Sequence, residues 1–163
     1  MLCKIDHYLK ILYRLSGYIA AIFLILVATF ILTGIASRIF GFYIRGLAEY
    51  SGYSMAASSF LALAYTFGEK GHIRITLFLE KANKEVRRFL DLWCLSIATF
   101  FSGFLSFYFI KMLIISIQFG ERSEGADEIY IWIPQVAVAL GSTIFFVCVL
   151  HNFILLILKR NNN

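Results

Sequence analysis

Four long stretches of the chain contain no Asp, Glu, Lys or Arg. They cover residues 17–37, 50–68, 92–110 and 129–158, and are 21, 19, 19 and 30 residues long. An α-helix needs about 20 apolar residues to cross ~30 Å of hydrocarbon, so each stretch can span a bilayer alone. The apolar and polar residues do not alternate as they would in a membrane β-barrel. The pattern predicts an all-α integral membrane protein. Its four transmembrane helices are expected over about residues 15–39, 46–68, 89–117 and 130–158.

The composition supports a membrane protein of one domain, residues 1–163. Hydrophobic residues make up 60% of the chain and charged residues 15%, and the mean hydropathy is +0.79. A soluble domain of this size could not bury so much apolar surface, whereas a bilayer accommodates it. The first apolar stretch is also longer than the ~7–15-residue core of a signal peptide, so it is expected to be a retained helix.

The basic residues predict an orientation. Eleven of the 15 Lys and Arg residues lie before the first predicted helix, between the second and third, or after the fourth. The other four are Arg38, Arg45, Lys111 and Arg122. Because positive charge is retained on the cytoplasmic side, both termini are expected to be cytoplasmic. The net charge of +5 is thus explained by topology, and no nucleic-acid partner is expected.

An amphipathic interfacial helix is predicted between the second and third spans, over about residues 75–88. Its apolar positions share one face, while its charged positions, including Arg87 and Arg88, occupy the rest. Such a helix lies at the membrane surface, where Lys and Arg contact lipid headgroups. A surface anchor without further function explains the same pattern.

The predicted spans lack the groups that transport and catalysis require. Their middle portions contain no Asp, Glu, Lys, Arg or His, and His151 lies near the cytoplasmic end of the fourth span. Ion and substrate pathways, proton relays and haem ligation all need such residues within the membrane. The chain is therefore not expected to be an enzyme, to bind a cofactor or metal, or to transport alone.

Small residues recur every four positions and predict close helix packing. The second helix has two such rows, one through Ala48, Gly52 and Ala56 and another through Ser54, Ser58 and Ala62. The third helix has Ala98, Ser102 and Ser106, and the fourth has Ala137 and Gly141. Two rows on the second helix indicate one internal contact and one partner contact. Internal packing of both rows is the alternative.

Three segments carry a resemblance to a known family. They are "RGLAEYSGY" at the start of the second helix (45–53), "GEKGHIRITLF" after it (68–78), and "YIWIPQVAVALG" at the start of the fourth (130–141). In this order and placement they resemble the small membrane subunit, the DctQ-type or Q subunit, of tripartite ATP-independent periplasmic (TRAP) transporters. The likeness covers nearly the whole chain.

The resemblance implies a transport function that the residues alone do not show. Such a subunit pairs with a large M-type membrane subunit of the elevator type, and a periplasmic substrate-binding protein delivers the substrate. The driving force is a sodium gradient, the substrates are organic acids such as C4-dicarboxylates, other carboxylates or sialic acid, and the location is the bacterial inner membrane. A self-associating small channel or exporter is the alternative function, and a membrane enzyme or redox subunit is a further class.

Several residues are candidates for partner contacts or structural roles. The resemblance matches Glu49 to an acidic position at the outer start of the second helix. Arg45 lies one turn earlier on the same face, so the two form either an exposed ion pair or a polar latch to the large subunit. Trp132 is expected to anchor the membrane interface, and Pro134 to lie in the first helical turn. The outer loop 119–128 is either a docking site for the binding protein or a solvated connection.

The element "GHIR" generates the first testable prediction. Gly71 permits a sharp turn out of the second helix, and extended backbone would place His72 and Arg74 on one side. They then either clamp helix ends or the large subunit, or merely contact lipid phosphate. If they clamp, replacing both His72 and Arg74 with Ala lowers the yield of the membrane complex and substrate uptake. Unchanged yield and uptake would refute the clamp and leave the lipid contact.

Overall fold

The computed structural model describes residues 2–42, 44–68, 84–123, 125 and 128–161. These residues form four α-helices and, within the described ranges, no β-strand. The prediction of an all-helical chain is confirmed. The helices are α1 (Leu2–Ile39), α2 (Leu47–Gly68), α4 (Lys84–Phe119) and α5 (Trp132–Asn161).

Three of these helices are long and apolar enough to cross a membrane. The qualifying segments are His7–Ile39 of α1, Phe89–Phe119 of α4 and Trp132–Leu158 of α5. The chain is therefore an integral membrane protein. Helix α2 has 22 residues but does not qualify by hydropathy, because Ser, Tyr and Gly occupy many of its positions.

The third membrane helix begins earlier in the chain than expected, within the predicted interfacial segment. Helix α4 begins at Lys84 and continues without a break to Phe119. Residues 84–88, which were assigned to the end of a separate interfacial helix, are thus the first turns of a membrane helix. A separate interfacial helix is not confirmed over these residues, because no Gly or Pro separates residue 84 from the apolar stretch and helix formation propagates through it. The remainder of the predicted interfacial helix, 75–83, lies outside the described residues.

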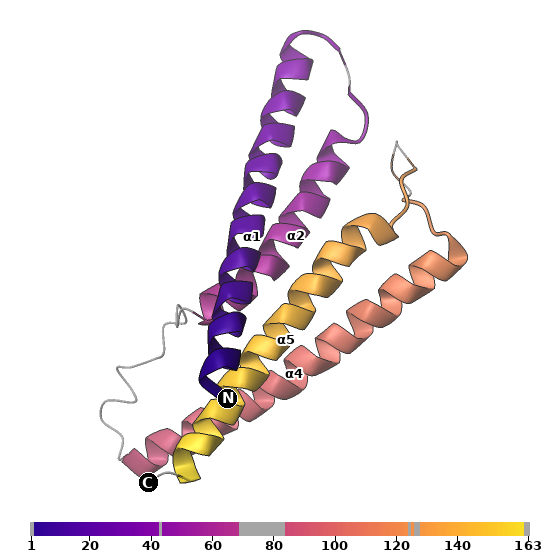
Figure 1. Cartoon of the computed structure of the whole chain (residues 1–163). Coiled ribbons are helices and arrows are strands. Elements are labelled where there is room, and N and C mark those ends of the chain that lie inside the picture. The colour runs from indigo at the N-terminus through magenta and orange to yellow at the C-terminus, as the bar shows by residue number, and fades with distance from the viewer. Residues whose placement is uncertain (1, 43, 69–83, 124, 126–127, 162–163) are drawn as a thin grey trace.

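The four helices run alternately up and down, so the described ends of α1 and α5 lie at the same end of the molecule (Figure 1). Helix α2 packs against both α1 and α5, and α4 packs against α5. Contact between α1 and α5 is slight. The packing order is therefore α1–α2–α5–α4, with α2 and α5 central and α1 and α4 peripheral.

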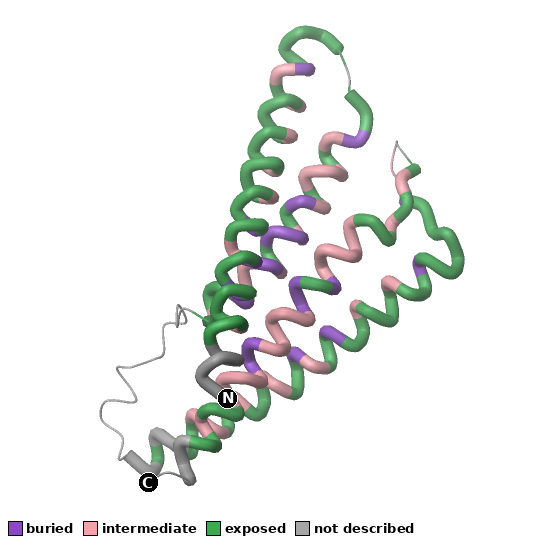
Figure 2. Tube along the Cα trace, viewed as in Figure 1, coloured by how far each residue is buried: buried purple, intermediate pink, exposed green. Residues whose placement is uncertain are grey.

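Small residues dominate the surfaces where the helices meet. The buried positions gather on the facing sides, while much of α1 and α4 is exposed (Figure 2). Close packing and hydroxyl hydrogen bonds hold membrane helices together where no hydrophobic driving force exists between them. The buried apolar residues include Ala20, Ala57, Ala64, Ala139 and Cys148, and the buried serines include Ser16, Ser54, Ser58, Ser102, Ser106 and Ser142.

Hydroxyl groups link neighbouring helices directly. Ser58 Oγ of α2 donates a hydrogen bond of 2.9 Å to the carbonyl oxygen of Ala20 in α1. Ser106 Oγ of α4 and Thr143 Oγ1 of α5 lie 3.0 Å apart and form a hydrogen bond. The predicted rows through Ser58 and Ser106 thus face other helices of the same chain.

Gly141 sets the distance between the two central helices. A Cβ atom at this position would lie 2.8 Å from the backbone carbonyl carbon of Phe60 and 2.9 Å from the backbone nitrogen of Leu61. Side chains can rotate away from a collision, but the backbone of α2 cannot. Any other residue at this position would force α5 away from α2.

This contact predicts a sharp contrast between two glycines. Gly141→Leu should destabilise the chain, since overpacking costs typically about 1–3 kcal/mol and here the obstacle is backbone. Gly52→Leu is the matched control, because a Cβ at Gly52 meets nothing within 4 Å. Thermal unfolding of the purified chain in mild detergent, followed by circular dichroism, measures both. Equal unfolding temperatures for the two variants would show that α2 and α5 do not meet at Gly141.

Candidate partner interface

The two small-residue rows of α2 lie in different environments. Ser54 and Ser58 are buried, and Ser58 bonds to α1 as described above. Ala48 and Gly52 are exposed, as are the next positions on the same side, Met55 and Ser59. We call Ala48, Gly52, Met55 and Ser59 the open face of α2. No described residue of the chain covers Gly52, so one row packs internally and the other is open.

Glu49 has a neighbour that its sequence position did not suggest. Its carboxylate lies directly against Gly125 in the loop between α4 and α5, where a side chain would overlap it. Glu49 also lies in the first turn of α2, where a negative charge interacts favourably with the helix dipole. Arg45 is exposed, and the structure, which describes both residues, gives no ion pair between Arg45 and Glu49. The contact of Glu49 is thus made within the chain.

A second contact holds the same loop. The hydroxyl groups of Tyr53 in α2 and Ser123 in the loop lie 2.8 Å apart and form a hydrogen bond. Tyr53 is four residues after Glu49, so both side chains leave the same side of α2. Ser123 is buried, although it belongs to a connecting loop. Glu49 and Tyr53 therefore dock the loop on the start of α2.

The described residues at the two ends of the docked loop are bonded to each other. Arg122 and Tyr130 form an isolated antiparallel bridge. The backbone nitrogen of Ser123 donates to the carbonyl oxygen of Ile129 at 2.7 Å. The Arg122 guanidinium lies 5.1 Å from the centre of the Tyr130 ring and within 3.8 Å of the Glu128 carboxylate. The exposed ion pair adds little free energy, but together with the backbone bonds it holds residues 122–123 beside residues 128–130.

The remaining candidate residues lie in separate places. Trp132 and Pro134 are in the first turn of α5, as expected for Pro134, and Trp132 is exposed. Gly141 is buried against α2. Arg87 and Arg88 lie in the first turns of α4, but their side chains are outside the described part. The last three candidates, in the "GHIR" element, are Gly71, His72 and Arg74, and they also lie outside the described residues.

The sequence indicates Glu49 and Gly52 as candidates but does not predict the docking of the loop. Tyr53, Ser123 and Gly125 were not candidates, although Tyr53 follows Glu49 by one helical turn. Spacing along a helix shows which residues share a face, but not which distant segment covers it. The partner of Tyr53 lies 70 residues further along the chain.

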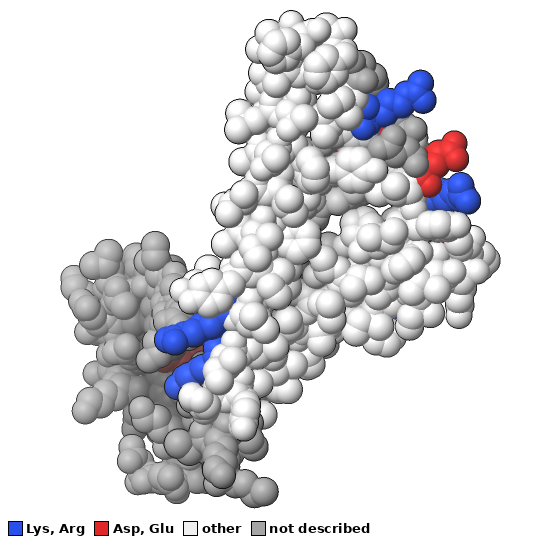
Figure 3. Space-filling model, turned by 45° about the horizontal axis from the view of Figure 1, so that its top comes forward, with Lys and Arg blue, Asp and Glu red and all other residues white. Residues whose placement is uncertain are grey.

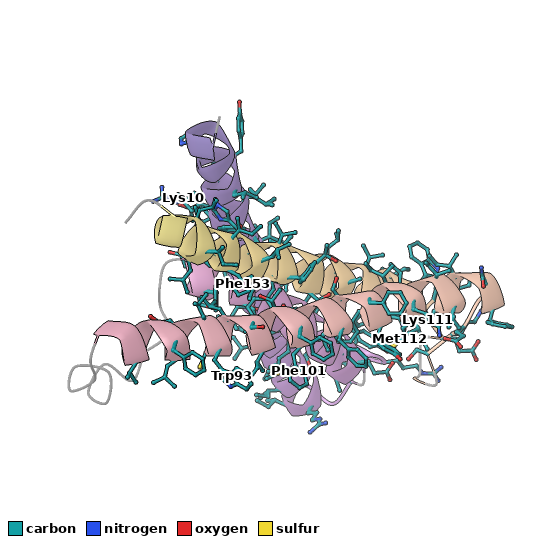
Figure 4. The ribbon with its side chains drawn as sticks, turned by 90° about the horizontal axis from the view of Figure 1, so that it is seen from below. Lys10, Trp93, Phe101, Lys111, Met112 and Phe153 are labelled. Atoms are coloured by element: carbon teal, nitrogen blue, oxygen red, sulfur yellow. The ribbon has the colours of Figure 1, made fainter. Side chains whose placement is uncertain are left out.

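The surface divides into a long uncharged zone with charge at its ends. Figure 3 shows Lys and Arg near both ends of the molecule and a broad surface of other residues between them. On α4, Trp93 and Phe101 extend away from α5 and are highly exposed (Figure 4). Lys111 lies near the other end of the same helix, with an exposed side chain. Among the described residues no group of three or more His, Cys, Asp or Glu could hold a metal ion.

The fold and this surface define a class of protein: an all-helical integral membrane protein with an uncovered, small-residue helix face. The comparison with known families identifies it further. Residues 26–159 match the family of tripartite ATP-independent periplasmic transporters, DctQ component, and the chain belongs to this family. No curated protein and no solved structure matches it significantly. The resemblance inferred from the three sequence segments is confirmed, and the chain is a transporter component.

The docked loop yields a prediction. Tyr53→Phe removes one hydrogen bond, worth about 0.5–1.5 kcal/mol. The fraction of molecules with an undocked loop should therefore rise about 2- to 10-fold. Gly125→Ala should act in the same direction, because its methyl group requires the Glu49 carboxylate to move. Tryptic cleavage after Arg122 in intact purified protein, quantified by mass spectrometry, measures the opening.

Two controls make this test specific. Tyr65→Phe, at the other end of α2, should leave cleavage after Arg122 unchanged. In a Glu49→Ala background the effect of Gly125→Ala should shrink, because contacting residues are coupled. Additive effects of Glu49→Ala and Gly125→Ala would contradict the contact.

Proposed function

We propose that this chain is the small scaffold subunit of a sodium-driven TRAP transporter for an organic acid. In this proposal it pairs with the large M-type membrane subunit and works with a periplasmic substrate-binding protein. The substrate is a C4-dicarboxylate, another carboxylate or sialic acid. The family match over residues 26–159 carries the proposal. The open face of α2 supports it, because it gives the large subunit a place to bind.

The proposed topology places four spans in one membrane domain, with both termini in the cytoplasm. Helix α2 would be about 33 Å long at the helical rise, which is sufficient to cross the hydrocarbon. Its lower hydropathy is compatible with a span because Ser54 and Ser58 are buried against neighbours rather than in contact with lipid. The distribution of Lys and Arg supports the orientation, in the inner membrane of a bacterium.

The proposed division of labour follows from the chemistry of the spans. Sodium and a carboxylate substrate need oxygen ligands and hydrogen-bond donors near the middle of the membrane. The middle of each helix supplies hydroxyl groups of Ser and Thr, and those at Ser58, Ser106 and Thr143 are used for helix packing. In this proposal the large subunit therefore holds the transport site, and the small subunit provides a fixed surface.

The open face suits contact with another membrane helix. Gly52 and Ala48 lack bulk, so a partner helix can approach the backbone of α2 closely. Met55 adjoins them with an exposed and adaptable side chain. A second copy of the chain could use the same face, which is the basis of the alternative function, a self-associating channel or exporter. The identity of the occupant distinguishes the two functions.

Purification of the tagged full-length chain from its native membrane tests the proposal. In mild detergent a much larger polytopic protein should co-elute in fixed proportion and be identifiable by mass spectrometry. Gly52→Leu should reduce the co-eluting partner about 10-fold, since overpacking of 1–3 kcal/mol corresponds to this range. Ala28→Leu adds comparable bulk on the exposed side of α1 and is the matched control.

The outcomes separate the alternatives. A homogeneous self-oligomer without a larger partner would refute the scaffold function and favour the channel or exporter. Co-elution of the large protein at equal levels with wild type and Gly52→Leu would retain the function but remove the open face as the contact site.

A further inference from the structure

A cavity of about 300 Å³ lies between the end of α1 and the start of α2. The α1 wall ascends from Phe30 and Ile31 through Gly34 and Ile35 to Ser37 and Arg38. These positions fall on one helical face and span about 12 Å along the helix axis. The wall is therefore apolar toward the middle of the membrane and polar toward its edge.

The opposite wall runs antiparallel to α1 and does not repeat this gradation. It is formed by Ile44, by Gly46 to Glu49 and by Ser51, at the start of α2. Leu47 faces Gly34, and the carboxylate of Glu49 lies against Gly125 of the loop. At the inner end the rings of Phe30 and Tyr50 pack against each other, with centroids 5.9 Å apart. Phe30 thus lines the cavity at one end of the α1 wall and Arg38 at the other.

Gly34 makes the cavity possible. A Cβ atom built on Gly34 has a single neighbour within 4 Å, Cδ1 of Leu47 at 3.9 Å. The space in front of Gly34 is therefore unfilled by the described side chains. In the closely packed interior of a protein such a space would cost free energy, but at the membrane edge it can be filled by another molecule.

Arg38 gives the cavity its specificity. Arg38 lines the cavity and is exposed, and no hydrogen bond or ion pair joins its guanidinium to a residue that the structure describes. A guanidinium binds phosphate through paired N–H donors, and this is stronger than a neutral hydrogen bond. A phosphate at Arg38 would lie next to an apolar groove directed toward the hydrocarbon core.

We propose that a phospholipid binds in this cavity, with its phosphate against Arg38 and one acyl chain along Gly34 and Phe30. The lipid comes from the leaflet nearest the α1–α2 connection. A free phosphate would leave the apolar wall unused, and the gradation from Phe30 to Arg38 matches the gradation within a phospholipid. The site lies on this chain alone, so the proposal does not depend on the large subunit.

Native mass spectrometry of the delipidated full-length chain in detergent tests the site, with dioleoyl phosphatidylethanolamine as the added probe. The wild type should bind one lipid molecule in preference to further ones. Arg38→Gln should weaken this binding about tenfold, because it removes a charge-assisted contact. Lys111→Gln removes another exposed cation, on α4, and should leave the lipid affinity unchanged.

The cavity itself is tested by a graded series at Gly34. Gly34→Ala leaves room and should bind lipid nearly as well as wild type, whereas Gly34→Leu fills the cavity and should abolish the preferred adduct. Ala28→Leu controls for added bulk on α1. Equal adducts in wild type, Arg38→Gln and Gly34→Leu would overturn the proposal, since they would indicate unspecific annular lipid.

Two further measurements keep the proposal falsifiable if a variant does not fold. A lipid with a photoreactive group on its acyl chain should label peptides that contain residues 30–38 or 44–51 in the unmodified protein. Labelling confined to other segments would refute the site. If inorganic phosphate at millimolar concentration binds with the same dependence on Arg38 while the lipid shows none, the ligand is free phosphate and the proposal fails.

Discussion

The close approach of α2 and α5 at Gly141 is the contact on which the rest of the structure depends. Both helices are central, because α1 packs on α2 and α4 packs on α5. Between membrane helices there is no hydrophobic driving force, so stability comes from dispersion contacts and hydroxyl hydrogen bonds that act only at short range. Gly141 allows α5 to approach the backbone of Phe60 in α2 closely. The hydrogen bonds of Ser58 and Ser106 hold the peripheral helices α1 and α4 against this central pair.

A chain built in this way has much more exposed than buried surface, and membrane lipid explains only part of that exposure. Large apolar residues such as Trp93 and Phe101 suit contact with lipid, which is as apolar as they are. Gly52 does not benefit from lipid contact, because it offers no side chain to pack. An exposed row of small residues is useful where a rigid helix can approach closely. The difference between α4 and the open face of α2 therefore distinguishes lipid-facing surface from the proposed protein-facing surface.

The sequence predicted the helices well because their signals are local. Uncharged stretches and four-residue spacing are properties of one helix, and the rows through Ser58, Ser106 and Gly141 do face other helices. Contacts across the chain were not predictable in this way. Nothing near Glu49 indicates Gly125, and two rows on α2 could not be told apart until α1 and α5 were placed. The continuity of α4 through residues 84–88 was missed because amphipathic periodicity suggests a surface helix whether or not that helix continues into a span.

Docking of the loop favours binding of a partner at the open face of α2. Binding is favoured when the surface is already in its bound conformation, because less conformational entropy is then lost on association. Glu49 and Tyr53 hold the start of α2 from one side through Gly125 and Ser123. Gly52 immediately precedes Tyr53 and points elsewhere, into open space. The helix is thus fixed by its own chain on one side and left uncovered on another, which suits the proposed role of a scaffold that presents a rigid surface to a partner.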